Sequence, residues 1–137
     1  MAFVLDASVA VAWAFADEDH AVAAAALALI RNDQGCVPSL WWFELHNVLI
    51  VNERRGRLRE ADTAVFLRNL GRLPIVVDRA PEEAAVLTLA RRHGLTVYDA
   101  SYLELAERYA APLATLDMTL AQAAQRENIS LIGREAA

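Results

Sequence analysis

Short apolar runs, mostly β-branched, alternate along this chain with longer segments whose apolar residues recur at helical spacing. The runs predict strands at residues 2–5, 36–37, 75–77, 95–98, 113–116 and 129–132, and the periodic segments predict helices at 18–31, 40–55, 60–70, 82–93, 99–110 and 118–127. Glycines and prolines such as Gly56, Pro74 and Gly94 fall between these elements. Strands separated by helices pair in parallel through right-handed crossovers. The pattern therefore predicts one α/β domain over residues 1–137, with a central parallel sheet and helices on both faces.

Four acidic residues occupy positions that suit a metal site. Asp6, Asp99 and Asp117 each follow an apolar run directly, which places them at the C-terminal ends of predicted strands, where open α/β sheets bind ligands. Glu44 lies in the middle of the apolar segment SLWWFELHNVLIV, where a charge is costly to bury without a partner. If the strands are neighbours, the four carboxylates converge. Such hard oxygen ligands suit Mg²⁺ or Mn²⁺, and sites of this kind usually act on phosphate.

A simpler interpretation of the aspartates is helix capping. An aspartate between a strand and a helix is a good N-cap, and any one of the three alone is more often a cap than a ligand. Capping does not explain Glu44, which lies inside a predicted helix. Asp78 also ends a predicted strand, and the residues alone leave open whether it belongs with the others.

Three polar residues near these acids are predicted to support them. Asn47 follows Glu44 by three residues on nearly the same helix face, where it can orient the glutamate or hold a metal-bound water. Ser8 and Thr115 each lie two positions from an aspartate and can donate hydrogen bonds to a carboxylate or a phosphate, although a capping role is equally consistent. His46 projects to the opposite side of the helix and is not counted as a ligand.

Charge and composition exclude several functions. The net charge of -5 argues against nonspecific nucleic-acid binding, yet all 13 basic residues are arginines. The absence of lysine excludes a Walker P-loop and Schiff-base chemistry. Cys36 is the only cysteine, which excludes intrachain disulfides and thiolate zinc sites.

The densest basic run is Arg54, Arg55, Arg57 and Arg59, which we interpret either as an RNA contact or as a solvated helix end. No apolar stretch is long enough for a membrane span, and no signal peptide is evident, so a cytoplasmic protein is expected.

The acidic motifs together resemble one family, the PIN-domain ribonucleases, and most closely the VapC-type toxins of bacterial toxin–antitoxin pairs. The resemblance covers the whole chain and follows the family order, with Asp6/Ser8 in DAS, Glu44/Asn47 in Glu-x-x-Asn, Asp99–Leu103 in YDA-x-YL-x-LA and Thr115/Asp117 in T-x-D. It implies a parallel sheet of about five strands with Asp78 on an edge strand, away from the site. It also implies a metal-dependent endoribonuclease whose products carry a 5′-phosphate and a 3′-hydroxyl. His46 and Ser101 depart from the usual small residues, but neither position carries a carboxylate.

Apolar content predicts a protein partner. The hydrophobic fraction is 56%, which is high for so small a domain. Predicted helical segments near 8–16, 40–51 and 60–70 carry Trp13, Phe15, Trp42 and Phe66, more large side chains than one sheet face covers. We expect part of this surface to be buried between chains, and the resemblance implies a homodimer that also binds the C-terminal segment of an antitoxin.

Functions from other classes fit the residues less well. A receiver domain has the same alternation and an acidic pocket, but it needs a lysine late in the chain. A haloacid dehalogenase-type phosphatase needs Asp-x-Asp after the first strand, whereas this chain has Asp6-Ala7-Ser8. A non-catalytic PIN scaffold would lack one or more of the four acids, all of which are present.

Overall fold

The computed structural model describes residues 2–15 and 20–134. In these residues four strands, β1 (Ala2–Leu5), β2 (Gln34–Pro38), β3 (Ile75–Asp78) and β4 (Leu113–Ala114), form one parallel sheet in the order β3-β2-β1-β4. The helices are α1 (Ala7–Ala12), α2 (Ala21–Ile30), α3 (Leu40–Arg54), α4 (Glu60–Leu70), α5 (Glu83–His93), α6 (Val97–Tyr109) and α7 (Met118–Arg126). None of these helices has the length and hydropathy that a bilayer span requires. The predicted α/β class is confirmed, with four strands rather than about five.

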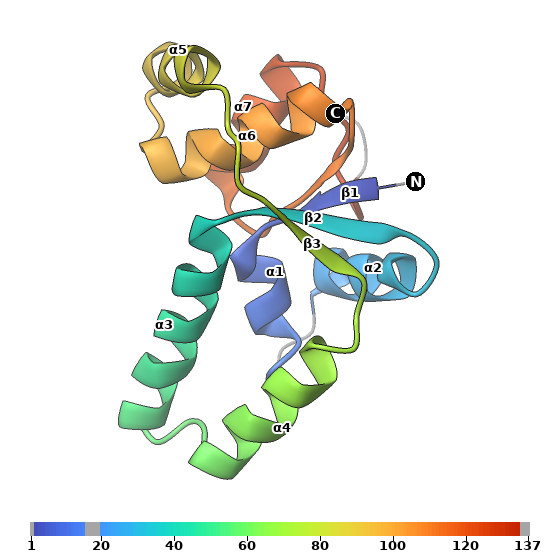
Figure 1. Cartoon of the computed structure of the whole chain (residues 1–137), viewed down its shortest axis with the longest axis vertical. Coiled ribbons are helices and arrows are strands. Elements are labelled where there is room, and N and C mark those ends of the chain that lie inside the picture. The colour runs from blue at the N-terminus through green and yellow to red at the C-terminus, as the bar shows by residue number, and fades with distance from the viewer. Residues whose placement is uncertain (1, 16–19, 135–137) are drawn as a thin grey trace.

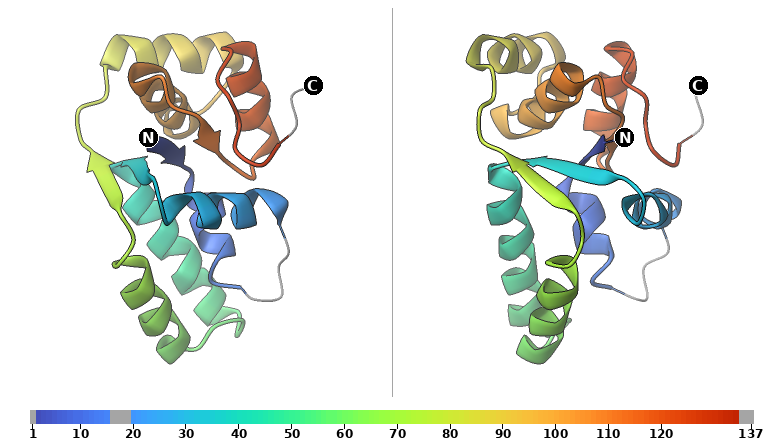
Figure 2. Two further views of the ribbon diagram at one scale, coloured as in Figure 1. Left: turned by 90° about the vertical axis from the view of Figure 1, so that its right-hand side faces the viewer. Right: turned by 45° about the vertical axis from the view of Figure 1, so that its right-hand side comes forward.

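Helices cover both faces of the sheet. Figure 1 shows α5, α6 and α7 on one side, and α1, α2 and α3 on the other, while α3 and α4 extend as a pair beyond the sheet. The views in Figure 2 show the same two layers. Because β1 is central and covered on both sides, Phe3, Val4 and Leu5 are fully buried, as expected for such a strand.

The topology brings four segments to the C-terminal end of the sheet. Leu5 at the end of β1 pairs with Ala114 at the end of β4. Helices α1 and α3 start at this end and contact each other, and α6 contacts β1, β2 and β4 from the other face. Asp78 ends β3, an edge strand separated from β1 by β2, as the family resemblance implied.

The prediction of a strand at residues 95–98 is wrong, because α6 already begins at Val97. Thr96 is its N-cap, and its hydroxyl accepts a 3.1 Å hydrogen bond from the backbone N–H of Asp99. A threonine followed three residues later by an acid is a helix-start signal, and it outweighs the β-branched character of a four-residue run. Asp99 therefore lies in the first turn of a helix and does not follow a strand.

Residues 129–132 also do not form the predicted strand. Only one bridge, between Leu113 and Leu131, joins this segment to the sheet. Asn128 just before it has a left-handed backbone with a φ of 60°, which turns the chain as it enters the sheet. The remaining predicted elements match the structure to within a few residues. The first residues of the helix predicted at 18–31, which corresponds to α2, lie outside the described residues.

Candidate active site

Asp6 is a buried carboxylate held by two hydroxyl groups. Its side chain is only 6% exposed, and its Oδ2 accepts hydrogen bonds of 2.7 Å from Ser8 Oγ and 2.7 Å from Thr115 Oγ1. Burial raises the pKa of Asp6, and the two hydroxyls act in the opposite direction. Asp6 occupies the N-cap position of α1, and the two hydroxyls affect its pKa more than the backbone N–H of Ser8 in the first turn of this helix does. Capping is therefore a minor part of what this carboxylate does.

The same two hydroxyls join the end of β4 to the start of α1. Ser8 Oγ accepts a 3.0 Å hydrogen bond from the backbone N–H of Leu116, and Thr115 Oγ1 accepts one of 3.0 Å from that of Asp117. Each hydroxyl thus donates to Asp6 and accepts from the chain that follows β4. The predicted placement of Ser8 and Thr115 beside a carboxylate is confirmed.

Glu44 is held from the other layer of helices. The phenol of Tyr102, which is fully buried in α6, donates a 2.6 Å hydrogen bond to Glu44 Oε1. Burial raises the pKa of Glu44, the hydrogen bond from Tyr102 lowers it, and the charges of Asp6 and Asp99 raise it further. Tyr102 lies three residues after Asp99 and therefore on nearly the same helix face, and this spacing was the only signal of its role in the sequence.

Asp99 and Asp117 differ in what their side chains do locally. Burial raises the pKa of Asp99, and the charges of Asp117 and Asp6 raise it further, while Thr96 and not Asp99 caps α6. Asp117 does cap α7, since its Oδ1 accepts hydrogen bonds of 2.8 Å from Thr119 N and 3.2 Å from Leu120 N. The capping interpretation is thus correct for Asp117.

The four predicted acids form one electrostatic cluster. Asp6 is affected by the charge of Asp117, Glu44 by those of Asp6 and Asp99, and Asp99 by those of Asp117 and Asp6. Burial is the main cause of the raised pKa values of Asp6, Glu44 and Asp99, and the charges of the neighbouring acids add to it, so ionising all four carboxylates together is unfavourable without a cation. A bound cation is the simplest remedy for such a cluster.

The kind of cation that fits is limited by the placement of the side chains. Among the described residues, no three His, Cys, Asp or Glu side chains stand together as a ready-made ligand set. Mg²⁺ binds typically through one or two carboxylates and keeps several of its waters. A hydrated hard ion held by one or two of these aspartates, with the other acids reaching it through water, therefore fits the donor set.

Other predicted residues lie away from this cluster. Asn47 is exposed, and within the described part of the chain its side chain makes no hydrogen bond to Glu44. The arginine run lies at the far end of α3, and Arg54 is ~15 Å along the helix axis from Glu44. Arg59 in this run forms a 3.0 Å ion pair with Asp62. Arg57 lies 4.4 Å from the ring centroid of Phe15.

A basic residue that the sequence did not indicate lies beside β4. Arg134 donates a 3.0 Å hydrogen bond from Nη2 to the backbone oxygen of Thr115. Thr115 is the residue whose hydroxyl holds Asp6. No pattern near Arg134 could have revealed this contact, because it depends on how the chain folds back after α7.

Comparison with known proteins agrees with the fold. The family model for the PIN domain matches residues 3–132, and the chain belongs to this family. Ribonuclease VapC3 of Pyrobaculum aerophilum is 39% identical over 84 residues, which cover 58% of this chain and 63% of that protein. The chain thus matches less than two thirds of the length of this relative. The family resemblance seen in the sequence is confirmed.

Two solved structures share the fold. The crystal structure of PAE2754 from Pyrobaculum aerophilum superposes with a TM-score of 0.70 at 27% identity, over 90% of this chain and 84% of that chain. The crystal structure of FitAcB from Neisseria gonorrhoeae gives a TM-score of 0.58 at 17% identity, over 96% of each chain. At the lower identity the likeness concerns the fold alone.

Proposed function

We propose that this protein is a Mg²⁺- or Mn²⁺-dependent endoribonuclease and the toxin of a toxin–antitoxin pair, formed as one domain over residues 1–137 and acting in the cytoplasm. The observation that carries the nuclease proposal is that Asp6, Glu44, Asp99 and Asp117 lie near enough for their charges to act on one another, with Asp6 held by Ser8 and Thr115 and Glu44 held by Tyr102. The PIN family match and the similarity to a protein named Ribonuclease VapC3 support it.

The residues of the cluster would have different duties. Asp6 and Asp99 are the proposed direct metal ligands, and Glu44 and Asp117 complete the site directly, through water or around a second ion. When bound, Mg²⁺ polarises a phosphodiester and lowers the pKa of an attacking water. Ser8 and Thr115 fix Asp6, and Tyr102 fixes Glu44, so that the acids keep their orientation when the substrate binds. Asn47 remains a proposed support, because its exposed side chain can still contact a metal-bound water.

The test of the nuclease proposal is cleavage of RNA by the purified protein with and without divalent metal. Cleavage should require Mg²⁺ or Mn²⁺ and stop in EDTA. Glu44→Gln should abolish cleavage, whereas Glu53→Gln, an acid-to-amide change on the same helix but outside the cluster, should not. Undiminished cleavage in EDTA would overturn the metal mechanism.

Exposed apolar side chains support the proposal of protein partners. Trp42 is 52% exposed and Phe43 is 69% exposed, and Ile50 and Val65 are also exposed on α3 and α4. We propose that this surface contributes to a homodimer and to binding of an antitoxin. Light scattering at micromolar concentration should report a dimer, and co-expression of the product of a neighbouring small gene should suppress toxicity. A monomer whose toxicity no neighbouring gene product suppresses would contradict both assignments.

Arg54, Arg55, Arg57 and Arg59 remain proposed RNA contacts, although they would meet the substrate away from the scissile bond. Arg54 and Arg55 are exposed at the end of α3. If both contact phosphates, replacing them with alanine should weaken RNA binding and reduce the salt dependence of the affinity, by about 0.7 in the log–log slope for each contact with a single strand. An unchanged slope would remove them from the binding surface.

A further inference from the structure

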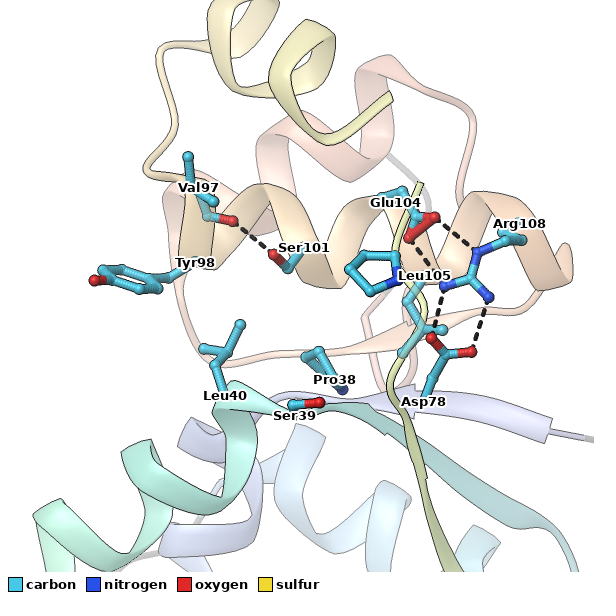
Figure 3. A pocket seen from close by; sticks show the side chains of 11 residues that line it. Pro38, Ser39, Leu40, Asp78, Val97, Tyr98, Ser101, Glu104, Leu105 and Arg108 are labelled. Atoms are coloured by element: carbon cyan, nitrogen blue, oxygen red, sulfur yellow. Dashed lines mark hydrogen bonds and ion pairs between the residues drawn. The ribbon is translucent and has the colours of Figure 1, made fainter. Parts of the chain in front are cut away.

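A cavity of about 260 Å³ lies beside the carboxylate cluster, at the ends of β2 and β3. Figure 3 shows α6 on one side of it, with Val97, Tyr98 and Ser101, and the start of α3 on the other, with Ser39 and Leu40. The ion pair between Arg108 and Asp78 closes one end. Tyr98 stands at the other end, and it is 63% exposed.

Two helices carry residues of both the cavity and the proposed active site. Leu40 lies one turn before Glu44 in α3, and Tyr98 lies one turn before Tyr102 in α6, so each pair occupies the same helix face with Cβ atoms ~5–6 Å apart. Glu44 and Tyr102 are themselves joined by a 2.6 Å hydrogen bond. A molecule in the cavity would therefore sit one helical turn from the carboxylate that the proposed reaction uses.

The charged groups in the wall are already paired with one another. Arg108 donates to Asp78 through Nη1 at 2.8 Å and Nη2 at 2.9 Å, and to Glu104 through Nε at 2.7 Å. One guanidinium thus faces two carboxylates, which leaves the wall with a formal charge of -1. A phosphate would be repelled by this wall and by the nearby acids, whereas an uncharged planar group would not.

Size and surface also favour a single planar group. A volume of about 260 Å³ falls just below the ~300–1,000 Å³ range of pockets for drug-sized ligands, so it suits one base better than two. Val97, Leu40 and Leu105 provide apolar contact, and the ring of Tyr98 provides an aromatic face. Aromatic faces stack with every nucleobase and so tolerate different sequences.

We infer that this cavity is a subsite for one unpaired base of the RNA substrate, next to the scissile phosphate, and that Tyr98 stacks on that base. The inference rests on the proposed ribonuclease function and adds to it a residue that positions the substrate. Because the Arg108, Asp78 and Glu104 groups are satisfied by one another, the subsite holds a base by shape and stacking, with little preference for its identity.

The first experiment uses binding, so that it does not depend on cleavage. A short unstructured RNA of mixed sequence, with 2-aminopurine placed at each position in turn, is added to the Glu44→Gln protein with Mg²⁺. When the cavity residues are unchanged, the fluorescence of 2-aminopurine should be quenched most strongly at one position of the RNA. The quench should disappear with Tyr98→Ala or with the cavity-filling Val97→Trp, and it should persist with Tyr98→Phe. Tyr109→Ala is the matched control, because Tyr109 is an exposed aromatic residue on the same helix as Tyr98 that does not line the cavity.

The second experiment measures cleavage of RNAs that carry one abasic position. Loss of the stacked base should raise the KM of the wild-type protein about 5-fold or more. The Tyr98→Ala protein should be insensitive to an abasic nucleotide at that same position, because its stacking partner is already missing. Equal sensitivity of both proteins at every position would overturn the subsite and leave the nuclease intact.

The two proposals fail in different ways. In one outcome the quenching depends on Tyr98 but the wild-type protein cleaves no RNA. That result would overturn the proposed nuclease activity and support a cavity that binds a base. Equal quenching at all positions, or quenching that survives both Tyr98→Ala and Val97→Trp, would overturn the subsite. If Tyr98→Ala instead changes only the oligomeric state, the cavity takes a side chain from a second protein chain and the base assignment is wrong.

Discussion

The phenol of Tyr102 donates a 2.6 Å hydrogen bond to Glu44, a residue that lies 58 positions earlier in the chain. The contact joins α6 on one side of the sheet to α3 on the other, at the C-terminal end of the strands. Burial and the neighbouring acids raise the pKa of Tyr102 far above its ordinary value, so the hydroxyl keeps its proton and remains a donor. The orientation of one proposed catalytic acid therefore depends on a neutral side chain from the opposite layer.

Replacing Tyr102 with phenylalanine should loosen Glu44 without unfolding the protein. The ring still fills the core, but one hydrogen bond to a charged group is lost, which contributes typically ~1.5–3 kcal/mol. We expect about 10-fold more Mg²⁺ to be needed for half-maximal cleavage, as measured in a metal titration. Tyr109→Phe is the control, because it removes a 2.8 Å hydrogen bond to Asp78, outside the cluster. Equal effects of the two variants on the metal titration would contradict the assignment.

Asp99→Asn should stabilise the metal-free protein at neutral pH while abolishing cleavage. Burial and the charges of Asp117 and Asp6 place the folded-state pKa of Asp99 above its unfolded value. For a carboxyl group shifted in this direction, the folded state binds more protons, so stability is greatest below the unfolded pKa and is lost as pH rises through the folded pKa. The asparagine variant escapes this loss.

Thermal unfolding in EDTA as a function of pH measures the effect. At pH 7 the midpoint of Asp99→Asn should exceed that of the wild type, and the gap should close as pH falls below ~3.9, the ordinary aspartate pKa, because the carboxyl is then protonated in both the folded and the unfolded state. Mg²⁺ should raise the wild-type midpoint more than that of the variant. A gap that stays constant from acid to neutral pH would show that charge repulsion is not its cause.

The sequence predicted which acids form the cluster but not how each is held. Asp6 and Asp117 follow β1 and β4 as expected, because apolar runs of a central parallel sheet are distinctive. The pattern predicts Asp99 at the end of a strand, since a four-residue run such as LTVY does not distinguish a strand from the start of a helix. The helix-start signal from Thr96 to Asp99 was available in the sequence and would have corrected it.

Contacts between distant segments lay beyond what local patterns can show. The bond from Tyr102 to Glu44 and the contact of Arg134 with Thr115 each depend on how layers of the fold meet. Helical spacing suggested that Asn47 would lie beside Glu44, yet its side chain is exposed. A spacing of three residues places two side chains on neighbouring parts of a helix surface but does not decide which of them turns to the core.

Thr115→Val should be more harmful than its small change in shape suggests. The hydroxyl is almost fully buried, donates to Asp6 and accepts from the N–H of Asp117. Valine leaves that half-buried N–H without its acceptor, which costs ~1–3 kcal/mol in the free energy of unfolding. Urea unfolding should show this loss and a cleavage assay a parallel loss of activity, while Thr115→Ser should retain most of both. Full activity in Thr115→Val would mean that Asp6 does not need this hydroxyl.

The ion-pair network around Arg108 gives a prediction about stability alone. Glu104 is only 2% exposed and accepts hydrogen bonds from Arg108 Nε at 2.7 Å and from the backbone N–H of Glu82 at 3.0 Å. Arg108→Met would leave the Glu104 carboxylate buried without its cation, at a cost of ~3–5 kcal/mol in the free energy of unfolding. Adding Glu104→Gln should restore much of this loss, because the amide oxygen still accepts from Glu82 while the charge is gone.

The pH dependence of the same network has the opposite sign to that of the acidic cluster. Arg108 holds the pKa of Asp78 well below its ordinary range. Its contribution to stability is therefore present above the unfolded pKa and is lost as pH falls through the folded one. At pH 7 Asp78→Asn should be less stable than the wild type and Asp99→Asn more stable. Both differences in stability should shrink as the pH falls. Unfolding curves recorded over one pH series should show the stabilities of the two variants approaching that of the wild type from opposite sides. If both variants are displaced in the same direction at pH 7, one of the two charge assignments is wrong.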